Sequence, residues 1–225
     1  MKEIGKRFTG SIKFPILILL VMWIIHAIQM LFGFDFGYLG IFPREVFGLR
    51  GVLFAPFIHG DWQHLISNSI PLGTMIFTIL FFYRKVAYRA VLMTTLLTGL
   101  AVWLFGRSVY HIGASGVVYA LVAFVFWSGV FRKNIKSIVL ALIIVFLYSG
   151  LFWGILPNQE GISWESHLMG GIVGIFVAWW YKKEIERDEE RYVPSWENEP
   201  REEKKFFLDR DVFQRTKEER RNELW

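Results

Sequence analysis

The 225-residue sequence contains no cysteine, which excludes disulfide bonds, thiolate metal ligands and a cysteine nucleophile. It also lacks an H-E-x-x-H motif, and His59 and His64 would lie about 140° apart around a helix, so we expect no metal and no cofactor. Charge is scarce before residue 182: residues 1–181 hold 19 charged side chains, whereas 26 of the 44 residues from Lys182 to Trp225 are charged. An apolar body with a charged tail is typical of a membrane protein.

Apolar residues dominate what is present, with 54% hydrophobic and 18% aromatic side chains. The net charge of +5 does not indicate nucleic-acid binding, because the tail is nearly balanced, with 12 basic and 14 acidic residues. The basic excess instead flanks the apolar segments. We therefore expect the lipid bilayer, and not nucleic acid, as the environment that this chain contacts.

Six segments are apolar over the roughly 20 residues that a membrane-spanning helix needs. The first of them is longer than a signal-peptide core and is followed by no small-x-small cleavage site, so we expect it to be retained. The predicted spans are residues 12–32, 62–82, 88–106, 115–131, 136–156 and 164–181. The predicted fold is an all-α membrane protein, a polytopic bundle of six transmembrane helices.

The basic residues beside the predicted spans indicate which ends face the cytoplasm. One set of ends carries ten of them: Lys2, Lys6, Arg7, Lys13, Arg84, Lys85, Arg89, Arg132, Lys133 and Lys136. The other set carries three: Arg44, Arg50 and Arg107. Both termini are therefore predicted to be cytoplasmic. The chain divides into an N-terminus (1–11), a six-helix domain (12–181) with an external loop (33–61), and a charged cytoplasmic tail (182–225).

Four polar residues stand near the external ends of three predicted spans. Ser115 begins the fourth span, His64 and Asn68 lie in the first turns of the second, and His167 lies in the first turn of the sixth. Strongly polar residues inside a membrane are costly, so their presence indicates function. Because these three helices all enter from outside, the four side chains share one depth and together indicate a site.

Helical spacing brings these residues toward one another. His64 and Asn68 are i and i+4 on one helix face, and Tyr119 lies one turn below Ser115. Small residues at 166, 170 and 174 form a stripe that lets another helix approach closely, and His167 points along it. A Ser115 hydroxyl within reach of the His167 imidazole is the arrangement of a nucleophile and its base. No carboxylate lies on the same side, so the pattern predicts a dyad.

Each residue also has a structural interpretation when it is taken alone. The G-A-S-G segment at residues 113–116 is compatible with close helix packing, Asn68 with an interhelical hydrogen bond, and His167 with a helix end at the interface. His26 is expected to be structural or to point into a polar gap, and His111 is expected to be a loop residue. The shared depth of Ser115, His64, Asn68 and His167 favours the catalytic interpretation.

With these residues in place, the sequence resembles the rhomboid intramembrane serine proteases. "GASG" in the fourth span, a histidine followed by Gly170 and Gly174 in the sixth, and "HGDWQHLISN" in the second match the family's signatures in order. The resemblance covers residues 10–181. It implies an intramembrane serine endopeptidase that cleaves transmembrane protein substrates, in a cell membrane and with its active site opening to the extracytoplasmic side.

The resemblance also implies a role for each site residue. Ser115 would be the nucleophile and His167 the general base, while His64, Asn68 and the Ser115 amide would form the oxyanion hole. Tyr119 would pack against His167, and a further set of residues would shape the site: Gly113, Gly116, Gly170 and Gly174. The family's Trp-Arg pair in the external loop is absent, and Arg44 or Arg50 is the candidate replacement.

Two parts of the chain are expected to control the access of substrate to the site. Two other functions are alternatives to proteolysis. The segment 156–166 is a candidate lid, and Phe152 and Trp153 are candidate gate residues at the end of the fifth span. A non-catalytic rhomboid-like protein that binds membrane clients would be expected to lack the serine or the histidine. A small transporter would be expected to show an internal repeat, and none is evident.

Overall fold

The computed structural model describes residues 2–133, 135–147, 163–184, 214 and 216–222. The chain forms two units, Met1–Glu189 and Glu190–Trp225, and the second contributes the short helix α8, Lys217–Asn222. All candidate site residues belong to the first unit. Phe152 and Trp153, most of the expected lid and most of the charged tail lie outside the described residues.

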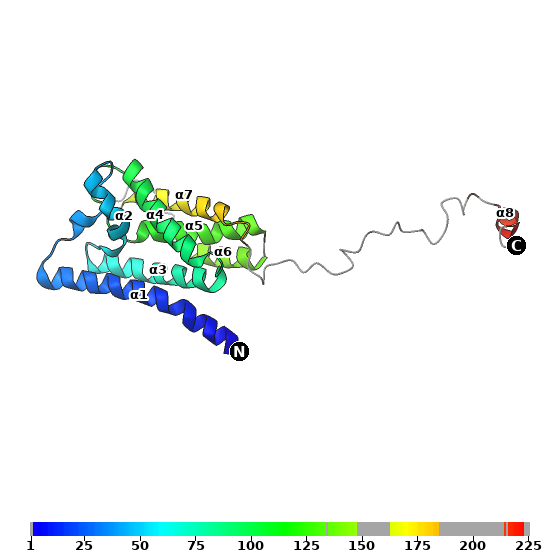
Figure 1. Cartoon of the computed structure of the whole chain (residues 1–225), viewed down its shortest axis with the longest axis horizontal. Helices are drawn as coiled ribbons and strands as arrows, with labels where there is room; N and C mark the ends of the chain where they lie inside the picture. The colour runs from blue at the N-terminus through cyan, green and yellow to red at the C-terminus, as the bar shows by residue number, and fades with distance from the viewer. Residues whose placement is uncertain (1, 134, 148–162, 185–213, 215, 223–225) are drawn as a thin grey trace. The chain divides into compact units, whose positions relative to one another are not determined.

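The first unit is a helical bundle (Figure 1). Its longer described helices are α1 (Lys2–Phe32), α3 (Trp62–Phe82), α4 (Ala87–Phe105), α5 (Ser115–Arg132), α6 (Ile135–Leu147) and α7 (Trp164–Trp180). Between α1 and α3 the chain forms short helical turns, η1 (Gly37–Leu39), η2 (Val46–Arg50), α2 (Gly51–Phe54) and η3 (Ala55–Phe57). No strand occurs among the described residues, where a single isolated bridge pairs Ile41 with His111.

The predicted all-helical fold is confirmed. Four described helices are long and apolar enough to cross a membrane: Gly5–Phe32, Trp62–Phe82, Ala87–Phe105 and Ser115–Arg132. The predicted spans at 136–156 and 164–181 coincide with helix over Ile135–Leu147 and Trp164–Trp180, and residues 148–156 are not described. A count of six crossings and the side on which the termini lie remain predictions.

Helix α1 is longer than expected, because it begins at Lys2 and not at residue 12. Its basic first turns are held by the end of α3, where the Arg7 guanidinium donates to the Phe81 carbonyl at 2.9 Å and lies over the Phe81 ring. Hydrophobicity predicts only the part of a helix that crosses lipid. The charged extension therefore could not be found from the apolar run.

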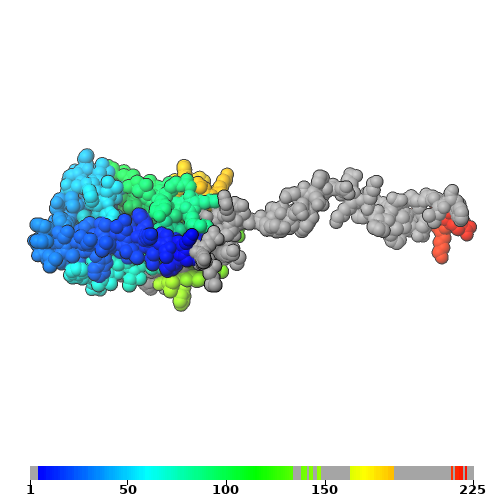
Figure 2. All heavy atoms as spheres, turned by 60° about the horizontal axis from the view of Figure 1, so that its bottom comes forward, coloured from blue at the N-terminus to red at the C-terminus, as the bar shows by residue number. Residues whose placement is uncertain are grey.

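Helix α1 packs along α3 at the outside of the bundle, as Figure 2 shows in dark blue. Many of its large apolar side chains face away from the protein, among them Ile16 (55% exposed), Leu17 and Leu20. An exposed apolar surface of this kind requires an apolar environment, which the bilayer supplies. The core of the bundle is formed instead by α5, which packs against α3, α4, α6 and most extensively against α7.

Candidate active site

Ser115 and His167 lie next to each other although 52 residues separate them along the chain. Ser115 is the first residue of α5 and His167 lies in the first turn of α7. The distance from the Ser115 Oγ to the His167 Nε2 is 2.8 Å, which is a hydrogen bond. A serine hydroxyl bonded to an imidazole can lose its proton to that ring as it attacks an electrophile.

The two helices approach this closely because glycine lines their contact. A Cβ atom added at Gly170 would collide with the carbonyl oxygen of Gly116, and one added at Gly174 would collide with that of Ala120. Backbone therefore packs directly on backbone along this side of α5 and α7. We call these four residues the glycine seam: Gly116, Ala120, Gly170 and Gly174. The seam sets the separation of Ser115 and His167.

The His167 ring is also held by an aromatic neighbour. The Tyr119 ring lies one turn below Ser115 and stacks on the imidazole, with centroids 4.2 Å apart and planes at 10°. Both residues are buried. Stacking restricts the rotation of His167 and keeps its Nε2 directed at the serine.

His64 and Asn68 on α3 are the candidate hydrogen-bond donors of the site. Gly113 has φ +100°, and a Cβ atom there would lie 2.6 Å from the His64 Nε2, so the His64 ring rests against the chain two residues before the serine. On the same helix, the buried Asn68 amide donates to the His64 carbonyl at 2.8 Å. Because a side-chain amide has two N–H groups, Asn68 has a second donor to offer.

The start of α5 adds a further attraction for negative charge. Ser115 is at the first helical position, where the backbone N–H groups have no partner inside the helix. The preceding residue, Ala114, makes no side-chain cap to them. The N-terminus of this 18-residue helix therefore directs its N–H groups and its positive dipole end toward the serine.

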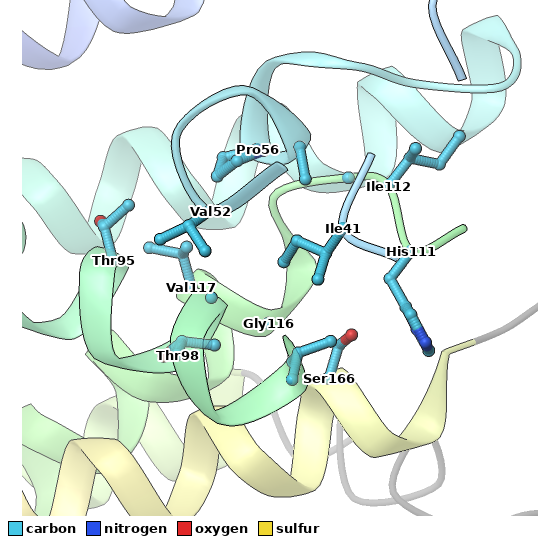
Figure 3. A pocket seen from close by; sticks show the side chains of 14 residues that line it. Ile41, Val52, Pro56, Thr95, Thr98, His111, Ile112, Gly116, Val117 and Ser166 are labelled. Atoms are coloured by element: carbon cyan, nitrogen blue, oxygen red, sulfur yellow. The ribbon is translucent and has the colours of Figure 1, made fainter. Parts of the chain in front are cut away.

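A small cavity of about 20 Å³ lies beside the first turn of α5 (Figure 3). Its lining includes Thr98 on α4, His111 before α5 and Ser166 on α7. The Thr98 hydroxyl is buried and has no hydrogen-bond partner among the described residues. The cavity is large enough for one water molecule, which such polar groups could bind.

The environment around His64 contains two more histidines that the sequence analysis gave no catalytic role. His59 is fully buried with its ring 5.0 Å from that of His64. Burial, followed by the neighbouring His64 and His26, lowers the pKa of His59 to about 3. His59 is therefore neutral at physiological pH.

Among the described residues no cluster of three His, Cys, Asp or Glu side chains could hold a metal ion.

Arg44 and Arg50, the two candidates in the external loop, both hold backbone in place. Arg44 donates to the Gly106 carbonyl at 2.7 Å and to the Ser108 hydroxyl at 2.8 Å, so it ties the loop to the chain that leads to Ser115. Arg50 donates to the Tyr38 carbonyl inside the loop. Of the two, Arg44 makes the connection toward the candidate site.

Comparison with known proteins places the chain in a family. The rhomboid domain family matches residues 45–184, which is more than half of the sequence. An uncharacterised protein of Mycobacterium bovis and one of Mycobacterium tuberculosis are each 32% identical over 168 residues, covering 71% of this chain and 70% of theirs. An uncharacterised protein of Mycobacterium leprae is 29% identical over 140 residues, 58% of this chain and 55% of its own.

The matched residues include the candidate site residues from His64 on α3 to Gly174 on α7. Together with the apolar helices, this match identifies a multi-pass membrane protein. The chain belongs to the rhomboid family.

Proposed function

We propose that this chain is an intramembrane serine endopeptidase that hydrolyses peptide bonds in or near the transmembrane segments of membrane proteins. The observation that carries the proposal is the 2.8 Å hydrogen bond between the Ser115 hydroxyl and the His167 imidazole. Family membership supports it, because rhomboid proteins are generally intramembrane serine proteases. The site would open to the extracytoplasmic side of a cell membrane that the chain crosses six times, with the charged tail in the cytoplasm.

In this proposal Ser115 attacks the scissile carbonyl while His167 removes its proton. His167 then returns the proton to the leaving amine, and water hydrolyses the acyl-enzyme in a second cycle of the same kind. General base catalysis of this type contributes about 10²- to 10⁴-fold to the rate. Tyr119 keeps the imidazole in the orientation that both proton transfers need.

Negative charge on the carbonyl oxygen would be stabilised from two sides. We assign this role to the His64 ring and the second N–H of Asn68 on α3, together with the Ser115 amide at the N-terminus of α5. Each donor aimed at the oxyanion contributes about 2.7–4 kcal/mol in soluble proteases. The positive end of the α5 dipole acts in the same direction.

The substrate must expose its backbone before Ser115 can attack it. In lipid, a helix that unwinds leaves polar groups without partners, so segments with helix-breaking or small residues should be cleaved first. Unwinding near the extracytoplasmic interface places these groups close to water.

The test is cleavage of a reconstituted transmembrane substrate with a Gly-Pro interruption near its outer end. We expect the wild-type chain to cleave it in liposomes, and Ser115→Ala and His167→Ala to be inactive. Thr74→Ala is the matched control, because its hydroxyl donates to the Ile70 carbonyl of its own helix. Retained binding of the segment without cleavage by wild-type protein would instead support a non-catalytic client-binding rhomboid.

A further inference from the structure

A second set of contacts joins the chain before Ser115 to the start of α7. His111 Nδ1 lies 2.5 Å from the Ser163 Oγ, and that hydroxyl lies 2.7 Å from the Ser166 Oγ. Arg107 and Glu165 form an ion pair at 2.9 Å between the same two segments. We call this set the polar clamp: Arg107, His111, Ser163, Glu165 and Ser166. Figure 3 shows the His111 side chain directed toward the beginning of α7.

The partners of His111 determine the direction of its hydrogen bonds. Its Nε2 lies 3.0 Å from the Arg107 carbonyl, which can only accept, so the neutral ring carries its proton on Nε2. Nδ1 then accepts from the Ser163 hydroxyl, whose oxygen accepts in turn from Ser166. Burial of His111 lowers its pKa and favours this neutral form.

Ser163 connects His111 to His167, because its side chain bonds the first and its backbone carbonyl bonds the second. It is the N-cap residue of α7, yet its side chain makes no cap to its own helix and bonds His111 instead. Its carbonyl accepts from the N–H of Ser166 at 3.0 Å and of His167 at 3.4 Å. The position of Ser163 therefore fixes the helical turn that carries His167.

The other side of His111 is anchored to the external loop. Its N–H and carbonyl both pair with those of Ile41, at 2.9 Å each. The ring is thus held by a backbone bridge on one side and by α7 on the other. Near it, Glu165 is buried, and its pairing with Arg107 avoids an unpaired buried charge.

We infer that His111 and Ser163 are positioning residues that hold His167 at hydrogen-bonding distance from Ser115. The inference rests on the proposed function, since it assigns these two residues to the same reaction. Neither residue contacts the substrate in this account. They act by fixing the first turn of α7, and a misplacement of about 1 Å between reacting groups can cost about 100-fold in rate.

The experiment compares Ser163→Ala with Ser163→Thr, which keeps the hydroxyl, and with His111→Phe. We expect Ser163→Ala and His111→Phe to lower kcat about 10- to 100-fold with KM within twofold, and Ser163→Thr to stay within about threefold of wild type. The double variant should lose less than the two single losses combined, because both changes break the same His111–Ser163 hydrogen bond. Val109→Ala, an exposed neighbour in the same segment, is the control and should retain wild-type kcat.

Rates are normalised to the folded fraction of each variant. If His111→Phe does not fold, the comparison of Ser163→Ala with Ser163→Thr tests the inference by itself. Equal kcat for Ser163→Ala and Ser163→Thr, or additive losses in the double variant, would overturn the inference. A wild-type chain without Ser115-dependent cleavage would instead overturn the proposed function, which separates the two failures.

Discussion

Asn68 illustrates at the residue scale how a catalytic donor differs from a packing residue. One of its N–H groups donates to the His64 carbonyl on its own helix, which leaves the second as the donor for an oxyanion. We expect Asn68→Ala to lower turnover by about 10²- to 10³-fold. The melting temperature in detergent should change little, since a hydrogen bond inside a membrane averages only about 0.6 kcal/mol.

Cleavage rates and thermal unfolding of the same Asn68→Ala preparation separate the two roles. His64→Ala is the comparison, and together the two changes should cost less than the sum of their separate effects if both donors serve one oxyanion. Normal turnover with a lowered melting temperature would make Asn68 a packing residue.

His59 predicts the pH dependence of stability. Its folded-state pKa is about 3, well below the ordinary 6.5, because the ring is buried beside His64 and His26. Between these two values the unfolded chain binds more protons than the folded chain, so the free energy of unfolding falls as the pH is lowered. We expect the melting temperature in detergent to fall from about pH 7 to about pH 4, and to fall less steeply in His59→Phe. If the melting temperature falls equally steeply with pH in the wild-type chain and in His59→Phe, His59 is not the group responsible.

Site residues can be predicted from the sequence where the signal is local, and they are missed where it depends on how the helices pack. Ser115, His64, Asn68 and His167 stand out because polar groups in apolar helices are costly, and that cost can be read from local sequence. His111 lies outside the apolar runs, and its partner Ser163 is 52 residues away. A contact of this kind depends on how the helices pack, which no local pattern encodes.

At the scale of elements, the glycine seam between α5 and α7 gives the sharpest test. Gly170→Ala should lower both the melting temperature and the turnover, because the added Cβ collides with the Gly116 carbonyl oxygen and separates Ser115 from His167. Gly171→Ala is the matched control on the next residue, where a Cβ would meet nothing within 4 Å. Similar activity and stability in the two variants, measured side by side, would show that the seam does not set the dyad distance.

Helix positions were largely predictable, because a run of apolar residues marks the part of each helix that lies in lipid. The starts of α3, α5 and α7 fall within one residue of their predicted positions at 62, 115 and 164. The short helical turns between residues 37 and 57 were not predicted in detail, since none is long enough to show a helical period.

At the scale of the whole molecule, the orientation of α3 tests the predicted topology. The absence of cysteine allows single cysteines to be introduced as reporters without a background. A membrane-impermeant maleimide should label Asp35→Cys, before α3, in intact spheroplasts, and Arg84→Cys, after α3, only once the membrane is opened. Both positions are exposed, so the reverse pattern would mean that the basic residues do not face the cytoplasm.

The central claim is that the His167 imidazole activates the Ser115 hydroxyl as a nucleophile, and a covalent adduct tests it most directly. The full chain in liposomes is treated with a fluorophosphonate, and the modified residue is located by peptide mass spectrometry. We predict a phosphonyl adduct on Ser115 in the wild-type chain and Thr74→Ala, with labelling slowed by at least about 100-fold in His167→Ala. An adduct on another residue, or labelling of Ser115 that proceeds equally fast without His167, would contradict the account.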